Sequence, residues 1–178
     1  MNLYTIGHSN HPIDKFILLL KDHQIEVLVD VRSTPFSRFN PQFNKNALQQ
    51  VLQKQVIEYV YAGETLGGRP KDPTCYKHNL IPSKAADYLH EINYPEVMKL
   101  PWFIKGIQQL LEIANWKTTV IMCGEEDPAR CHRQHLIAGY LMRVHPDVTI
   151  LHIRGDGSLI NAKFIPEAGQ ANAEQLTL

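Results

Sequence analysis

Residues 120–133, VIMCGEEDPARCHR, form the stretch that decides the fold, and they lead into the apolar-periodic segment QHLIAGYLMR at residues 134–143. The uninterrupted apolar run that ends at Cys123 predicts a buried strand. Residues 125–129 predict a turn, and the spacing of apolar residues from Arg130 onward predicts a helix. The sequence therefore places a strand, a turn and a helix in direct succession.

A strand-to-helix turn of this kind is a place where ligands bind in open α/β sheets. The carboxyl end of the strand opens into a crevice, and the first N–H groups and the dipole of the helix favour an anion or a thiolate. Cys131, His132 and Arg133 are predicted to lie in the first turn of the helix. We therefore expect a binding or active site here.

Strand-like runs alternate with amphipathic helical patterns along the rest of the chain. Strands are predicted at residues 3–6, 26–31, 57–61 and 148–153, and helices at residues 13–20, 46–55 and 102–114. This alternation predicts an α/β fold, a single three-layer, Rossmann-like domain with a mostly parallel sheet. We expect the domain to span residues 1–166 and residues 167–178 to form a polar, frayed C-terminal tail.

Composition restricts the classes of function. The chain has 178 residues, and its 18 Lys and Arg balance its 18 Asp and Glu, so the net charge does not indicate a surface that coats a polyanion. The first residues lack the pattern of a signal peptide, and no apolar stretch reaches membrane-spanning length. We therefore expect a cytoplasmic protein without a membrane partner. The sequence does not indicate an oligomeric state.

The three cysteines are expected to differ in environment. An odd number of cysteines without a signal peptide indicates reduced thiols rather than a disulfide framework. Cys75 is predicted to lie in a polar surface excursion, residues 71–83, so its substitution is expected to change little. Cys123, at the end of an apolar strand, is predicted to be buried and inert.

The unusual polar residues follow the ends of predicted strands. His8 follows the first strand, Arg32 and Ser33 follow the second, and a glycine-rich segment at residues 63–68 follows the third. The carboxyl ends of parallel strands lie at one edge of the sheet, so these clusters are expected to converge. The alternative is that turn residues simply gather at strand ends.

Five blocks of the sequence carry a family resemblance. They are TIGHSN (5–10), VDVRSTPFSRF (29–39), LGG (66–68), CGEEDPARCHR (123–133) and LHIRGDG (151–157). In this order the blocks resemble the domain-of-unknown-function family 488 (DUF488). The resemblance implies a compact α/β domain whose signature residues converge, and it names no substrate.

Three residues are candidates for catalysis. A cysteine at a helix N-terminus beside a histidine and an arginine has the environment that lowers a thiol pKa, which makes Cys131 a candidate nucleophile or redox thiol. The alternative for Cys131 is a small thiol buried under the sheet. His8 is a candidate general acid or base, or else a loop-holding hydrogen-bond donor, and Glu125 is its carboxylate partner.

Arginines beside the predicted edge indicate an anionic ligand, because a guanidinium group binds phosphate or carboxylate with two parallel bonds. For Arg133 the alternative is an internal bond to a carboxylate such as Glu125. We expect Arg32, Cys131 and Arg133 to meet in one site. The residues predicted to bind the anion are Arg32, Ser33, Arg38, Gly67, Gly68, Arg69, His132 and Arg133.

No cofactor is identified by a motif, because the chain has no GxGxxG and no GxxxxGK[ST]. A metal is a weaker hypothesis, since the sequence has no CxxC and no HxxxH spacing, and we assign no metal ligand from the sequence. The residues that could converge as a mixed set of sulfur, nitrogen and oxygen ligands are His8, Cys123, Glu125, Cys131 and His132. His132 and His135 are three residues apart and could share a helical face.

Three functions remain at this stage. The first is an enzyme acting on an anionic small molecule, a nucleotide or a nucleic-acid component. The second is a non-catalytic module that binds a nucleotide or nucleic acid, and the third is a metal-dependent redox or hydrolytic protein. Stoichiometric metal in the purified protein distinguishes the third from the other two.

Overall fold

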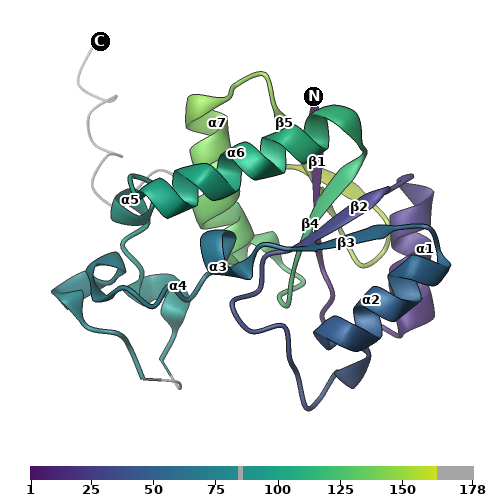
Figure 1. Cartoon of the computed structure of the whole chain (residues 1–178), viewed down its shortest axis with the longest axis horizontal. Helices are drawn as coiled ribbons and strands as arrows, with labels where there is room; N and C mark the ends of the chain where they lie inside the picture. Colours follow the sequence, from purple (N-terminus) through teal and green to yellow (C-terminus); the bar gives the residue numbers. More distant parts are fainter. Residues whose placement is uncertain (84–85, 164–178) are drawn as a thin grey trace, which may run out of the picture.

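A six-stranded sheet with the strand order β3-β2-β4-β1-β5-β6 forms the centre of the molecule (Figure 1). The computed structural model describes residues 1–83 and 86–163. All neighbouring strands are parallel except β6, which runs antiparallel to β5. The predicted mostly parallel α/β fold is confirmed. The strands are β1 (Asn2–Gly7), β2 (Val27–Asp30), β3 (Glu58–Tyr61), β4 (Thr119–Cys123), β5 (Thr149–Ile153) and β6 (Leu159–Asn161).

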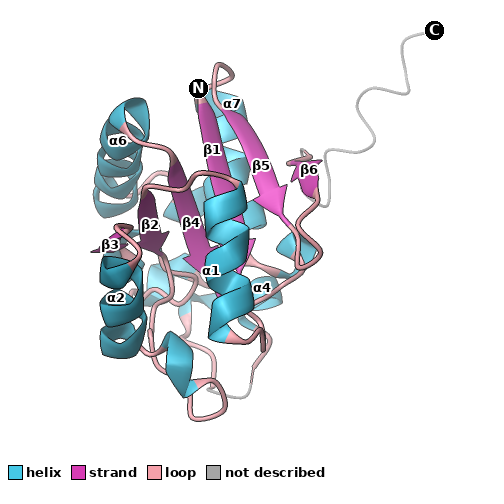
Figure 2. Ribbon diagram, turned by 90° about the vertical axis from the view of Figure 1, so that its right-hand side faces the viewer, coloured by secondary structure: helices cyan, strands magenta, loops and turns pink. Residues whose placement is uncertain are grey.

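Helices cover both faces of the sheet and complete the three layers (Figure 2). The helices α1 (Ile13–Asp22) and α2 (Lys45–Lys54) pack on one face, while α6 (Pro101–Trp116) and α7 (Gly139–Val144) pack on the other. Successive side chains of β4 alternate between the two cores, as the pleat of a strand requires. Its last residue, Cys123, belongs to the core on the side of α6 and α7.

Shorter elements connect the main ones. They are the helices α3 (Gly63–Leu66), α4 (Tyr88–Glu91) and α5 (Tyr94–Val97), the 3-10 turns η1 (Pro41–Phe43), η2 (Pro73–Cys75), η3 (Lys77–Asn79) and η4 (Pro128–Arg130), and the π-helical segment η5 (Arg133–Ala138). In Figure 2 the strands point toward the end of the molecule where α4 lies. The connections there enclose the site described below.

The segment around Cys75 does not lie on the surface, as the sequence predicted. Cys75 is fully buried within the larger core, and the next residue, Tyr76, is also buried. Tyr76 forms a β-bridge with Ile92, and the amide of Asn93 donates to the carbonyl of Cys75 at 2.8 Å. Burial raises the pKa of the Cys75 thiol to about 11. The prediction of a surface cysteine was wrong because this bridge turns a polar segment inward.

The helix that follows β4 begins later than predicted. Cys131 has an extended backbone, with φ −138° and ψ 142°, and its carbonyl accepts the amides of Gln134 and His135. Cys131 therefore precedes the helix instead of lying in its first turn. The predicted tail, residues 167–178, falls outside the described residues. Within residues 1–83 and 86–163, no helix combines the length and apolarity needed to cross a membrane.

Candidate functional site

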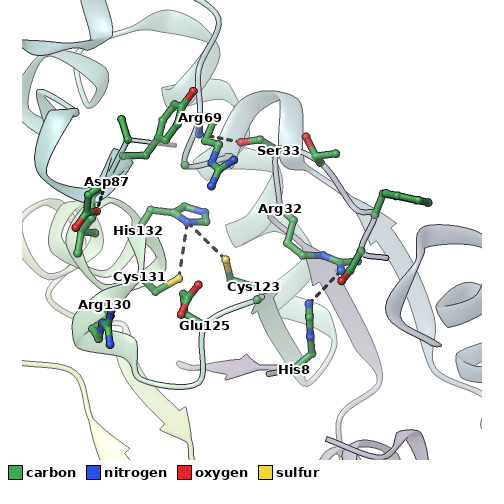
Figure 3. A pocket seen from close by; sticks show the side chains of 18 of the residues that line it. His8, Arg32, Ser33, Arg69, Asp87, Cys123, Glu125, Arg130, Cys131 and His132 are labelled. Carbon is green, nitrogen blue, oxygen red and sulfur yellow. Dashed lines mark hydrogen bonds between the residues drawn. The ribbon is translucent and has the colours of Figure 1, made fainter. Parts of the chain in front are cut away.

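A pocket of about 990 Å³ opens at the carboxyl ends of β1, β2 and β4 (Figure 3). His8 follows β1, Arg32 follows β2, and Cys123 ends β4. The strand ends therefore converge as the rule for parallel sheets requires. The residues predicted from sequence that line this pocket are His8, Arg32, Ser33, Gly68, Arg69, Glu125, Cys131 and His132.

The floor of the pocket is formed by two thiols and an imidazole. Nδ1 of His132 lies 3.6 Å from Sγ of Cys123 and 3.7 Å from Sγ of Cys131, as Figure 3 shows. The other ring nitrogen, Nε2, lies 3.2 Å from the carbonyl oxygen of Val31. Because a carbonyl only accepts, Nε2 must carry the proton that is donated. In the neutral ring, Nδ1 then presents its lone pair to the two sulfur atoms.

The two thiols differ in acidity, and in the opposite sense to the sequence prediction. The pKa of Cys123 lies well below its ordinary value, because the Cys131 thiol donates to its sulfur and because His132 and Arg133 are close. Burial and the neighbouring Cys123 raise the pKa of Cys131 well above its ordinary value. Cys123 is buried, as predicted, but it also lines the pocket. The lowered thiol pKa predicted for Cys131 belongs to Cys123.

Gly68 makes room for the imidazole of the floor. A Cβ atom on Gly68 would lie 2.6 Å from Cγ and Nδ1 of His132, which is too close for van der Waals contact. A Cβ on Gly67 would likewise lie 2.4 Å from Oγ of Ser33, and this hydroxyl accepts the amide of Arg69 at 2.8 Å. These residues shape the wall of the pocket. Gly67 does not itself line it.

Arg32 is buried and bound to a carboxylate. Its Nε and Nη2 donate to the two oxygens of Asp30 at 2.9 and 2.6 Å, and Nη2 also donates to the carbonyl of Phe43 at 2.8 Å. The third nitrogen, Nη1, lies 3.2 Å from Nε2 of His8 (Figure 3). Asp30 offsets the charge of this guanidinium, so Arg32 fixes the wall more than it attracts an anion.

His8 is held in one orientation by four contacts. Nε2 accepts from Arg32, and Nδ1 lies 2.8 Å from the carbonyl of Ser9, to which it donates. The ring stacks on Phe43 with centroids 4.4 Å apart, and it lies at the edge of Gly124. Burial, with a contribution from Arg32, lowers the pKa of His8. His8 is therefore a neutral imidazole whose two nitrogens are already engaged, which favours the loop-holding alternative.

Arg133 is fully buried and does not line the pocket. Its Nη1 donates to the carbonyl of Glu125, and its Nη2 donates to the carbonyl of Glu126 at 2.6 Å. Arg133 therefore locks the turn after β4, as the alternative interpretation expected, but through backbone carbonyls instead of the Glu125 carboxylate. Of the three residues expected to meet, only Arg32 and Cys131 line the pocket.

The rim carries exposed charged side chains. Arg69 and Arg130 are exposed and line the pocket, and the guanidinium of Arg69 lies 4.4 Å from the ring centroid of Tyr88. Glu125 is also exposed and lines the pocket, whereas Arg38 is exposed but does not line it. The rim therefore carries two cations, Arg69 and Arg130, and two carboxylates, Glu125 and Asp87, and all four are exposed to solvent.

Arg130 and Tyr94 are two of the lining residues that were not predicted from the sequence. Arg130 belongs to the block CGEEDPARCHR, so its position there was a usable signal. Tyr94 begins α5 and is half-buried, and within the described part of the chain its hydroxyl has no hydrogen-bond partner. Burial raises the pKa of Tyr94. No motif around Tyr94 indicated this position.

The fold and the pocket define a three-layer α/β protein with a thiol and imidazole floor below a charged rim that carries two exposed arginines. A family model described as "Domain of unknown function DUF488" matches residues 12–141, and the chain belongs to this family. The first and last of the five resembling blocks lie outside the matched residues. Neither a curated protein nor a solved structure matches the chain.

Proposed function

We propose that this protein is an enzyme that acts on an anionic small molecule, or on a nucleotide or nucleic-acid component, at the carboxyl edge of its sheet. One observation carries the proposal, namely that Cys123, Cys131 and His132 lie in the same pocket as the exposed guanidinium groups of Arg69 and Arg130. The cations supply binding energy for an anion. The sulfur and imidazole groups supply the reacting end of the site.

The wall of the pocket favours a ligand that also has an aromatic part. Phe36 and Phe39 line the pocket and are 62% and 94% exposed. Exposed aromatic rings beside cations bind nucleobases by stacking, while the cations bind the phosphates. This arrangement supports a nucleotide or nucleic-acid component over a simple inorganic anion.

Turnover is tested with the purified full-length protein and a panel of nucleoside monophosphates, diphosphates and dinucleotides, with products followed by mass spectrometry. We expect at least one compound to be converted by the wild type and not by Cys123→Ala. Cys75→Ala serves as the matched control, because it removes the thiol outside the pocket. Binding of the panel without conversion of any member would support the non-catalytic binding module instead.

The charge of the rim is tested separately, by the ratio of the alkylation rates of Cys123 with iodoacetate and iodoacetamide on metal-stripped protein. Across a separation on the order of 8 Å in a water-like dielectric, one unit charge changes the interaction energy by about 0.5 kcal/mol, so each guanidinium is expected to favour the anionic reagent about twofold. We expect the iodoacetate-to-iodoacetamide ratio to be higher in the folded protein than in the urea-denatured chain. Each of the single variants Arg69→Ala and Arg130→Ala should lower the ratio of the folded protein about twofold. Equal ratios in the folded and denatured chain contradict an anion site.

A further inference from the structure

The three groups on the floor have the arrangement of metal ligands. Sγ of Cys123, Sγ of Cys131 and Nδ1 of His132 all lie within 4.8 Å of one another, and all three residues are buried. The two sulfur-to-nitrogen distances are 3.6 and 3.7 Å. In a tetrahedral zinc site with Zn–S of about 2.3 Å and Zn–N of about 2.0–2.1 Å, a sulfur and a nitrogen ligand lie about 3.6 Å apart.

We propose that Cys123, Cys131 and His132 bind one Zn²⁺ ion, with the fourth coordination position open to the pocket. Two thiolates and one imidazole are ligands that zinc prefers. The spacing of the three residues is not a familiar zinc motif, since seven residues separate the cysteines and the histidine follows the second one directly. The ligands meet because β4 supplies the first and the two residues that immediately precede η5 supply the other two.

Contacts behind the ligands support this assignment. A metal-bound histidine almost always donates its other ring N–H to a carboxylate, a backbone carbonyl or water, which fixes the tautomer that binds the ion. Nε2 of His132 makes such a bond to the carbonyl of Val31. Gly68, by lacking a Cβ, leaves the space in which the ring takes this orientation.

The two other histidines that the sequence offered as ligands, His8 and His135, are engaged elsewhere. Both ring nitrogens of His8 are bonded, to Ser9 and to Arg32. Nε2 of His135 lies 2.7 Å from the carbonyl of Ala129. Glu125 lines the pocket but is not part of the group of ligand atoms that lie within 4.8 Å of one another, so the described residues supply three protein ligands. Three is the number found in catalytic zinc sites, whereas structural zinc sites are closed by four.

Charge balance indicates what would fill the fourth position. Arg133 is fully buried, and its hydrogen bonds within the described part of the chain go to carbonyl oxygens. The Glu126 carboxylate also interacts with Arg133, but it is paired with Arg154, so these three groups together keep one positive charge to be balanced by another group. Zn²⁺ and two thiolates are together neutral, so zinc, ligands and Arg133 carry one positive charge. An anion in the fourth position, either hydroxide or an anionic group of the ligand, neutralises it.

The role of the ion rests on the proposed function, but its binding does not. In the proposed enzyme a zinc ion at this place would act as a Lewis acid at the floor of an anion-binding pocket, in contact with bound water or with the ligand itself. Cys123 and Cys131 would then serve as ligands during the reaction. This deepens the proposed function by making its chemistry metal-dependent.

Cobalt substitution tests the site directly. The reduced full-length protein is stripped with a chelator and titrated with Co²⁺. We expect one Co²⁺ per chain, with the intense visible bands of tetrahedral cobalt and a thiolate-to-cobalt charge-transfer band, both abolished by added Zn²⁺. Cys123→Ser, Cys131→Ser and His132→Ala should each weaken binding by at least about 100-fold, while Cys75→Ala and His135→Ala should not. Absence of the charge-transfer band, or equal loss in Cys75→Ala, overturns the proposal.

A measurement on the wild type guards against variants that fail to fold. Zn²⁺ should protect Cys123 and Cys131, but not Cys75, from iodoacetamide, as mapped by peptide mass spectrometry. Alkylation of Cys123 and Cys131 at the same rate with and without Zn²⁺ overturns the metal site.

Turnover separates this inference from the proposed function. Full turnover by the stripped protein overturns the role of zinc and leaves the proposed enzyme in place. Stoichiometric tetrahedral Co²⁺ in a protein that converts none of the nucleotide panel supports the metal site and contradicts that substrate class.

Discussion

The buried arginines around the pocket and the exposed arginines on its rim make different kinds of contact. On the inner side, Arg32 and Arg133 are 7% and 0% exposed, and their guanidinium groups bond to a carboxylate and to backbone carbonyls. On the rim, Arg69 and Arg130 are exposed to solvent. An arginine near a site therefore either holds the site together or meets its ligand. The two roles predict opposite effects of substitution.

Substitution of Arg133 should have the largest effect on stability. Arg133→Lys keeps the charge but loses the planar fork that reaches the carbonyls of Glu125 and Glu126. Hydrogen bonds from a charged group contribute roughly 1.5–3 kcal/mol each, so we expect the free energy of unfolding to fall by about 3 kcal/mol in urea titrations. Arg69→Lys is the matched control. Unchanged stability in Arg133→Lys, together with weaker anion binding, would assign Arg133 to the ligand.

His152, a buried histidine on β5, should make the stability of the fold depend on pH. Burial, with Arg133 and Arg154, lowers the pKa of His152 to about 4 from an ordinary value of 6.5. The unfolded chain therefore binds a proton below about pH 6.5 that the folded chain binds only below about pH 4. The stability from neutral His152 is complete above pH 6.5 and is lost as the pH falls toward 4, by about 2–3 kcal/mol.

Urea titrations at several pH values between 7 and 4 measure this loss. His152 is held between the hydroxyl of Thr5 and the side-chain oxygen of Gln134, each at 2.7 Å. His152→Gln keeps a polar side chain and removes the titrating group, so its stability should depend less on pH than that of the wild type. Equal slopes in the two proteins would show that His152 is not the source.

Substitution of Cys75 should lower stability, as expected for a buried position and unlike substitution on the rim. Cys75→Ser places a hydroxyl group in the core, where an unsatisfied polar group costs roughly 1–3 kcal/mol. We expect thermal unfolding of Cys75→Ser at a lower temperature than that of Cys75→Ala, which buries no polar group. Wild-type stability in Cys75→Ser would restore the original prediction of a surface position.

The sequence was sufficient for the five parallel strands and for the edge that carries the site, but it did not predict the short antiparallel strand β6. Continuous apolar runs defined β2 and β4, and the rule for parallel sheets brought the ends of β1, β2 and β4 together. The burial of Cys75 was not predictable, because it depends on the bridge between Tyr76 and Ile92. These two residues are far apart in the sequence, and the polar segment around Tyr76 has no periodic pattern that indicates the pairing.

For two residues, Arg133 and Cys123, the sequence held a signal about the direction of the side chain that was not used. Along a helix, residues four apart share a face, and Arg133, Ile137 and Leu141 are all buried on the same side. This spacing indicates that Arg133 points into the core. Along a strand the side chains alternate, so Cys123 had to lie on the face opposite to Met122. What the spacing does not give is the hydrogen bond that makes Cys123 the more acidic thiol.

Substitution on the rim should have the smallest effect on stability and still change binding. Arg130 is exposed and is the last residue of the turn η4, so Arg130→Ala should change the free energy of unfolding by less than about 0.5 kcal/mol. The same change removes one cation from the pocket, and the affinity for an anionic ligand should fall about twofold or more at low salt and less at high salt. Arg38→Ala removes an equally exposed cation that does not line the pocket, and it should leave the affinity unchanged. If the two variants weaken binding equally, the attraction comes from the overall charge of the chain. The division between buried structural arginines and ligand-binding arginines on the rim then fails.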